Sequence, residues 1–151
     1  MIMPIVDISK KDVIVREAIA EGFIRLKRDT IEAIKKGSVK KGDPLETAKV
    51  SAALAVKNTP QVIPYCHPIP IEHIDISFEI LEDGIKALCK VKATSKTGVE
   101  MEALVGVTIA LLTIWDMVKY LEKDEKGQYP HTRIEYIKVV KKVKANAAQR
   151  T

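Results

Sequence analysis

Two charged residues, Asp116 and Lys119, follow the most apolar stretch of the chain, residues 103–115. They are three positions apart, so on a helix a carboxylate and an amine would share one face. Partial burial beside the apolar stretch would make them a usable acid and base pair. The alternative is an exposed ion pair, which stabilises a helix by only about a few tenths of a kcal/mol.

His67 lies in a proline-rich segment, TPQVIPYCHPIP, which spans residues 59–70 and holds four of the seven prolines. Proline excludes a helix or a central strand and favours extended backbone at the residue before it. We therefore expect a stiff loop that presents Tyr65, Cys66 and His67 at fixed positions. An imidazole can exchange protons near neutral pH, but the spacing leaves open whether His67 acts in chemistry.

A helix-start signal precedes the apolar stretch. Thr97 can cap the helix and Glu100, three residues later, can complete a capping box, which is a purely structural role. Met101 and Glu102 have no such role and stand where helix N–H groups can bind an anion. At about 1.5 Å per residue, Glu100 and Asp116 are about 24 Å apart along the axis. If both ends of this helix are functional, the site must be built between subunits.

Several common sites are excluded by motif. The sequence contains no P-loop, no dinucleotide-binding glycine motif and no hydrolase nucleophile elbow. The cysteines and histidines lack zinc-ligand spacing, so we expect no metal centre. Cys89 alternates with apolar residues and is interpreted as a small buried hydrophobe rather than a nucleophile.

Length and composition indicate one globular domain over residues 1–151, with a core at about 6–143 and a polar tail at 144–151. The 25 basic and 20 acidic residues give a net charge of +5, which suits an anionic ligand or nucleic acid. Two cysteines and a start, MIMPIVDISKKD, without a signal-peptide pattern predict a reduced cytoplasmic location. The uncharged stretch of about 13 residues is too short for a membrane span, which needs about 20.

Periodicity predicts the order of elements as β α α β β α β. This is the ferredoxin-like split βαβ pattern, an α+β fold with an antiparallel sheet and helices on one face. Residues 13–27 fit both a strand and a helix, and Gly22 favours the strand. Three helices are expected: one at 30–36, capped by Asp29 or Thr30, one at 44–58, capped by Asp43, and one at 97–122. A hairpin is expected at 74–81 and 85–92, and a last strand at 134–141.

Four separated motifs carry a resemblance over about residues 6–140. They are KGD (41–43), PYCHPIPI (64–71), KTGVEMEAL (96–104) and LTIWDMVK (112–119). In this order they resemble the cyclic pyranopterin monophosphate synthase family, molybdenum cofactor biosynthesis protein C. The resemblance implies a lyase that converts 3′,8-cyclo-7,8-dihydroguanosine 5′-triphosphate to cyclic pyranopterin monophosphate and releases pyrophosphate.

The resemblance also assigns residues. It implies catalytic roles for Asp116, Lys119 and Lys41, whereas an isolated lysine would by default be a solvated surface residue. The chain departs from the family near its C-terminus, where Lys142 stands in for a lysine of a Gly-rich loop. The substrate-binding candidates are Tyr65, Cys66, His67, Met101, Glu102, Glu100, Arg16, Lys49 and Lys142.

The resemblance further implies a hexamer, built as a trimer of dimers with the site at the dimer interface, and a functional link to the radical SAM enzyme that makes the substrate. No cofactor is expected to be required, although Mg²⁺ can accompany substrate phosphates. We expect no nucleic acid or membrane partner. Two alternatives are a basic ferredoxin-like module that binds nucleic acid without catalysis and a purely structural oligomer scaffold.

Overall fold

The structure is a computed structural model that describes residues 5–145. Four strands and three helices follow one another in the order predicted, and one additional short helix precedes the hairpin. The elements are β1 (Ile14–Arg25), α1 (Arg28–Lys36), α2 (Pro44–Lys57), α3 (Thr59–Val62), β2 (His73–Ile80), β3 (Gly84–Ser95), α4 (Glu100–Glu122) and β4 (Arg133–Ala145).

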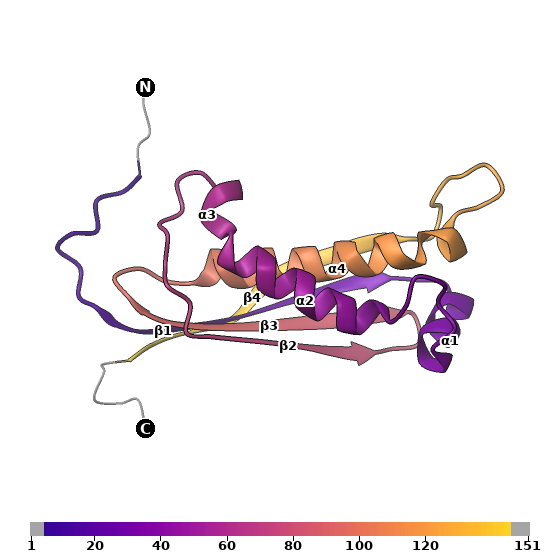
Figure 1. Cartoon of the computed structure of the whole chain (residues 1–151), viewed down its shortest axis with the longest axis horizontal. Coiled ribbons are helices and arrows are strands. Elements are labelled where there is room, and N and C mark those ends of the chain that lie inside the picture. Colours follow the sequence, from indigo (N-terminus) through magenta and orange to yellow (C-terminus); the bar gives the residue numbers. More distant parts are fainter. Residues whose placement is uncertain (1–4, 146–151) are drawn as a thin grey trace.

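The strands form one antiparallel sheet in the order β2-β3-β1-β4. The long helices α2 and α4 lie side by side over one face of this sheet, and α1 lies near one end (Figure 1). The α+β, ferredoxin-like prediction is therefore confirmed, as is the strand at 14–25. Helix α4 crosses the two central strands, so its residues dominate the core.

Two glycines explain how closely α4 approaches the sheet. A Cβ built on Gly22 of β1 would lie 2.6 Å from Val107 Cγ1, and one built on Gly106 of α4 would lie 2.6 Å from Cys89 Sγ. Small residues on both surfaces let the helix backbone settle onto the strands. Cys89 is fully buried at this contact, as the alternation predicted, and burial raises the pKa of its thiol to about 12.

Three predictions about the helices are wrong. The proline-rich segment does contain a helix, the four-residue α3, because Pro60 occupies its first turn, where the missing N–H costs nothing. Helix α4 begins at Glu100 after Val99, without the capping box between Thr97 and Glu100. Helix α1 follows Lys27 rather than a capping Asp29 or Thr30.

A buried carboxylate replaces the missing local cap of α1. Glu122, at the end of α4, is fully buried and accepts hydrogen bonds from the backbone N–H of Lys27 (3.1 Å), the Thr30 hydroxyl and the Thr132 hydroxyl (2.5 Å). It therefore satisfies donors at the start of α1 from a position far along the sequence. Sequence spacing cannot reveal such a tertiary cap.

The sheet is longer at the C-terminus than predicted. Strand β4 continues to Ala145 and pairs Lys144 with Arg16 and Ala145 with Val15. The first two residues of the predicted polar tail thus belong to the sheet, while 146–151 lie outside the described residues.

In the described part, α4 alone is long and apolar enough to cross a membrane, but half of its most apolar window is buried against the rest of the protein, as in a core helix.

Candidate active site

Three predicted catalytic residues meet near the C-terminal end of α4. Asp116 Oδ1 lies 3.1 Å from Lys119 Nζ, and its Oδ2 lies 3.3 Å from Lys41 Nζ. The Asp116 side chain is 58% exposed, so of the two alternatives that the sequence left open, the exposed ion pair is the one the structure shows. Hydrogen bonds from Lys119 and then from Lys41 lower the pKa of Asp116, which keeps it a carboxylate between two ammonium groups.

The turn before α2 brings Lys41 to this end of α4. Gly42 has φ +116, which favours glycine, and its N–H donates to Val39 O at 3.2 Å. Asp43 then caps α2, as predicted, by accepting from Leu45 N at 2.9 Å. Both ends of the short turn are thereby fixed.

Tyr120 attaches the same turn directly to α4. Its hydroxyl oxygen accepts a hydrogen bond of 2.8 Å from the backbone N–H of Lys40, and the Lys40 ammonium lies 5.4 Å from the centre of its ring. Since Lys41 is the next residue, these contacts position its amine against Asp116. Sequence reasoning missed Tyr120 because its partner is 80 residues away.

A shallow cleft of about 350 Å³ opens beside Asp116 and Lys119. Its other lining residues are Leu112, Trp115 and Tyr129, and the two aromatic rings meet edge to face at 5.5 Å between centroids. Tyr129 comes from the loop after α4 and was not among the predicted site residues. This end of the helix thus combines the ion triad of Lys41, Asp116 and Lys119 with an apolar, aromatic wall.

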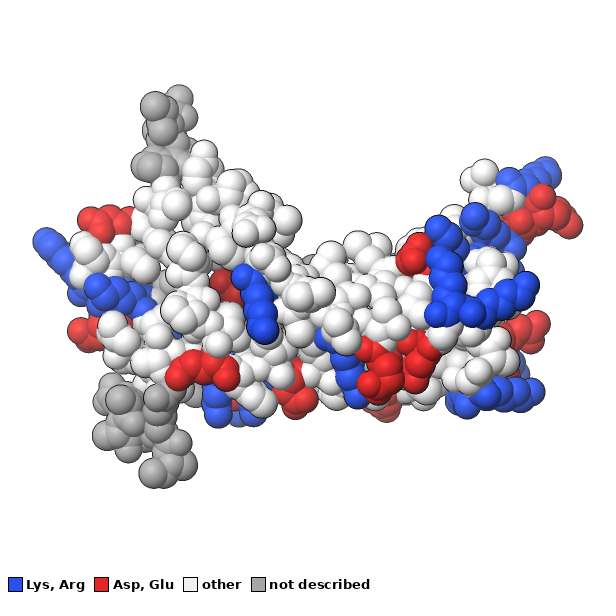
Figure 2. Space-filling model, viewed as in Figure 1, with Lys and Arg blue, Asp and Glu red and all other residues white. Residues whose placement is uncertain are grey.

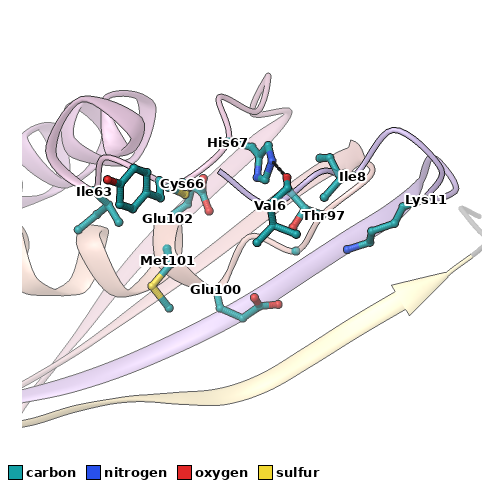
Figure 3. A pocket seen from close by; sticks show the side chains of 12 residues that line it. Val6, Ile8, Lys11, Ile63, Cys66, His67, Thr97, Glu100, Met101 and Glu102 are labelled. Carbon is teal, nitrogen blue, oxygen red and sulfur yellow. Dashed lines mark hydrogen bonds between the residues drawn. The ribbon is translucent and has the colours of Figure 1, made fainter. Parts of the chain in front are cut away.

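A larger cavity of about 470 Å³ lies near the other end of α4 (Figure 3). The structure brings the proline-rich loop over the start of the helix, so six of the predicted residues line this one cavity: Tyr65, Cys66, His67, Glu100, Met101 and Glu102. It also adds residues that were not predicted, namely Val6, Ile8, Lys11, Ile63, Thr97 and Gly98.

Glu102 is the deepest ionisable group of this cavity, with 1% of its surface exposed. Its Oε2 accepts a hydrogen bond from Cys66 Sγ at 3.5 Å, and among the described residues its buried Oε1 has no hydrogen-bond partner. Burial raises the pKa of Glu102, and burial together with the nearby Glu102 carboxylate raises the pKa of Cys66 to about 11. Cys66 therefore acts as a thiol donor rather than a thiolate nucleophile.

His67 is oriented by the N-terminal segment. Its Nε2 lies 2.7 Å from the backbone oxygen of Val6, and a carbonyl oxygen can only accept, so Nε2 carries the hydrogen. In the neutral ring this leaves Nδ1 as the free acceptor. The loop thus holds an imidazole of defined tautomer beside the cavity, which is what proton transfer requires.

The three remaining predicted residues, Lys142, Arg16 and Lys49, have different surroundings. Glu100 pairs with Lys142 of β4 at 3.2 Å, which joins two candidates at the edge of the larger cavity. Arg16 is 5% exposed and donates to the backbone oxygens of Ser95 (3.3 Å) and Lys96 (3.2 Å), so it braces the turn before α4. Lys49 pairs with Glu46 at 3.2 Å and lines neither the cleft nor the cavity.

The candidates therefore form two groups, at the start of α4 and near its end. Residues 100 and 116 both lie on α4, and they are about 24 Å apart along the helix axis. Within residues 5–145, no three His, Cys, Asp or Glu side chains come together in a way that could hold a metal ion.

Comparison with known proteins agrees with the motifs. The model of the MoaC family matches residues 5–145. A protein of Thermococcus onnurineus is 62% identical over 139 residues, which cover 92% of this chain and 89% of that protein. Another, of Pyrococcus abyssi, is 59% identical over 144 residues, or 95% and 91% of the two chains.

A third relative, from Sulfolobus acidocaldarius, is 59% identical over 140 residues, which cover 93% of this chain and 98% of the relative. All three are named probable cyclic pyranopterin monophosphate synthase. The family resemblance predicted from the four motifs is confirmed: this chain belongs to the MoaC family.

Proposed function

We propose that this protein is a cyclic pyranopterin monophosphate synthase of molybdenum cofactor biosynthesis. It would convert 3′,8-cyclo-7,8-dihydroguanosine 5′-triphosphate to cyclic pyranopterin monophosphate and pyrophosphate, as a phosphorus–oxygen lyase. The observation that carries this proposal is the ion triad of Lys41, Asp116 and Lys119, held by α4 and the turn before α2 in a chain of this family.

The ion triad supports the phosphate chemistry. When a hydroxyl of the sugar-derived part attacks the α-phosphorus, an O–P bond forms and the bond to pyrophosphate breaks. The hydroxyl proton has to leave, and Asp116 is a carboxylate that can accept it. Lys41 and Lys119 offset the charge that develops on the departing pyrophosphate. Mg²⁺ can arrive with the substrate phosphates, and we expect no resident cofactor.

The larger cavity supports recognition of the guanine-derived ring system. Such a ring presents N–H donors, and the buried Glu102 carboxylate lines the cavity with an oxygen, Oε1, that has no hydrogen-bond partner among the described residues. His67 and Tyr65 lie in the same cavity. A buried polar site of this kind discriminates strongly, because a substrate without the matching donors leaves the carboxylate unsatisfied.

The two groups cannot both contact one small substrate within a single subunit, since they are about 24 Å apart. We therefore propose a homo-oligomer in which each site combines the start of α4 from one subunit with the end of α4 from another. An exposed apolar groove beside α4 supports this arrangement. It is lined by Val62, Ile63, Met101, Leu104, Val105, Thr108, Ile109 and Ile137.

The family resemblance is our reason for proposing a hexamer, a trimer of dimers. It is likewise our reason for proposing a radical SAM enzyme as the source of substrate. The cytoplasmic location, which was predicted from the cysteine content, also stays a proposal. None of these three proposals is needed for the chemistry within one site.

A nucleic-acid-binding module is the alternative of another class. Figure 2 shows a dense group of basic side chains toward the end of the molecule that carries the end of α4, with further basic and acidic side chains scattered over the rest of this face. A groove that follows a nucleic-acid backbone needs a continuous basic track, so the visible pattern favours a compact anionic ligand.

The direct test supplies the cyclic GTP-derived intermediate to the purified protein and measures pyrophosphate and cyclic phosphate. We expect stoichiometric release of pyrophosphate with formation of the cyclic product. Absence of both products from correctly folded protein would exclude the proposed activity.

Mixing variants tests whether sites are shared between subunits. Asp116→Ala and His67→Ala should each be inactive, and their mixture should recover up to roughly a quarter of wild-type activity at sites that draw both intact ends, by the statistics of random pairing. Failure to recover activity after demonstrated subunit exchange would contradict a shared site.

A further inference from the structure

We infer that the N-terminal segment, residues 5–11, is part of the substrate site and that Lys11 binds a phosphate group of the substrate. The inference rests on the proposed function for the identity of the ligand. It assigns a role to a segment that carries none of the four motifs and that sequence analysis treated as ordinary chain.

The N-terminal segment packs against the site instead of extending away from β1. Asp7 Oδ1 accepts from Ser9 N at 2.9 Å, and Lys11 N donates to Ile8 O at 3.0 Å, so residues 7–11 form a compact turn. The Lys96 ammonium donates to Ser9 O at 3.2 Å. Because Lys96 belongs to the turn that leads into α4, this bond ties the segment to the start of that helix.

The segment also forms one wall of the larger cavity. Val6, Ile8 and Lys11 line it together with the proline-rich loop, and Val6 O holds the His67 ring in place. Figure 3 shows these side chains facing the cavity from the side opposite Cys66 and Glu102. A ligand in the cavity would therefore contact both the loop and the N-terminal segment.

The charges of the cavity lining single out Lys11. It is the only lysine or arginine among the described lining residues, which also include the carboxylates Glu100 and Glu102. Glu100 is already paired with Lys142 at 3.2 Å, and Glu102 lies deep on the other side.

The Lys11 ammonium is free to bind a ligand. Within residues 5–145 it makes no hydrogen bond or ion pair, and in Figure 3 it extends toward the side of the cavity where Glu100 lies. An unpaired ammonium at the edge of a site for a triphosphate is suited to a charge-assisted hydrogen bond with a phosphate oxygen.

Lys10 provides a matched control. It is adjacent in sequence, equally charged and exposed, but it does not line the cavity. Lys10→Ala and Lys11→Ala therefore each remove one positive charge from the N-terminal segment. They differ in whether the lost ammonium faces the substrate.

The experiment compares both variants in steady-state turnover of the cyclic GTP-derived intermediate and in calorimetric binding of pyrophosphate. We expect Lys11→Ala to raise KM about tenfold or more, as loss of a charge-assisted contact does, with kcat within about threefold of wild type. Pyrophosphate should bind correspondingly more weakly. Lys11→Arg should restore most of the loss, and Lys10→Ala should behave as wild type.

Equal behaviour of Lys10→Ala and Lys11→Ala in an active protein would overturn the inference while leaving the proposed function intact. If wild type turns over no substrate, the proposed function fails, and the pyrophosphate titration still decides the role of Lys11. Melting temperatures of all variants identify any loss that comes from misfolding.

Discussion

The two ends of α4 each carry a carboxylate, but the two carboxylates have opposite surroundings. At the start, Glu102 is almost completely buried, and burial raises its pKa. Near the end, Asp116 is mostly exposed, and two lysine partners lower its pKa. One carboxylate is deprived of water and the other is surrounded by cations, so the same functional group is tuned in two directions along one helix.

In the function we propose, this contrast separates recognition from phosphate chemistry. A buried, incompletely satisfied carboxylate penalises ligands that lack the right donors, whereas an exposed carboxylate between lysines tolerates water until a ligand or another subunit covers it. The start of α4 is therefore nearly complete within one subunit, while the end is open. That asymmetry is what a site assembled between subunits requires.

The largest effect should come from Asp116→Asn, which keeps the shape of the side chain but removes its charge and its ability to accept a proton. We expect turnover to fall by about 10²- to 10⁴-fold. Stability should change by no more than about 1 kcal/mol, because exposed ion pairs contribute little. Glu32→Gln is the control, since it removes the carboxylate from another exposed i,i+3 pair, with Lys35 at 3.8 Å. Comparable activity in the two variants would show that the ion triad is only a surface feature.

An intermediate effect should appear in the pH dependence of stability. The folded state raises the pKa of Glu102 above its ordinary 4.5, so wild type loses stability as pH rises through the folded value. Glu102→Gln does not titrate there, so its free energy of unfolding, relative to wild type, should increase as pH rises.

Asp116→Asn should show the opposite sign in the same measurement. A lowered folded pKa gives wild type a stabilising contribution above the ordinary value of 3.8, which is lost as pH falls through the folded value. Urea denaturation at a series of acid to neutral pH values measures both differences. Curves of the same sign for the two variants would refute the contrast between the two ends.

The smallest effect should come from Tyr120→Phe, which removes only the acceptor of the Lys40 N–H bond. We expect kcat to fall about two- to tenfold, the equivalent of one ordinary hydrogen bond. A less fixed Lys41 lowers the pKa of Asp116 less, so the acid limb of the kcat profile should move to higher pH.

Tyr136→Phe is the matched control for that variant. Its hydroxyl bonds Glu21 at 2.7 Å on the sheet face away from α4, so neither kcat nor the pH profile should change. A loss in Tyr120→Phe without movement of the acid limb would argue against positioning of Lys41.

Much of the fold follows from local sequence patterns. The alternation in 74–92 sets the hairpin, and Asp43 followed by Pro44 starts α2. Gly22 favours a strand over a helix for β1 because glycine destabilises a helix interior. The predictions of the helix ends were wrong. Helix α1 is capped by Glu122, 95 positions from Lys27, and no local pattern encodes a partner that the chain brings in from its other half.

The candidate site was predictable where a motif holds several residues together. The loop with Tyr65, Cys66 and His67 and the helix start with Met101 and Glu102 do line one cavity, although their roles stay predictions. Tyr120, Tyr129 and Lys11 were missed because each depends on contacts between distant segments. The exposure of Asp116 was left open because an apolar stretch next to a charge does not reveal which side of the helix faces the sheet.

Glu122 has a consequence for the local stability of α4. The last turn of a helix commonly frays, because its final carbonyl groups lack partners. Here unwinding of that turn would strip the Lys27 amide and the Thr30 and Thr132 hydroxyls of their common acceptor inside the protein. We therefore expect the end of α4 that carries Asp116 and Lys119 to unfold together with α1 and the start of β4.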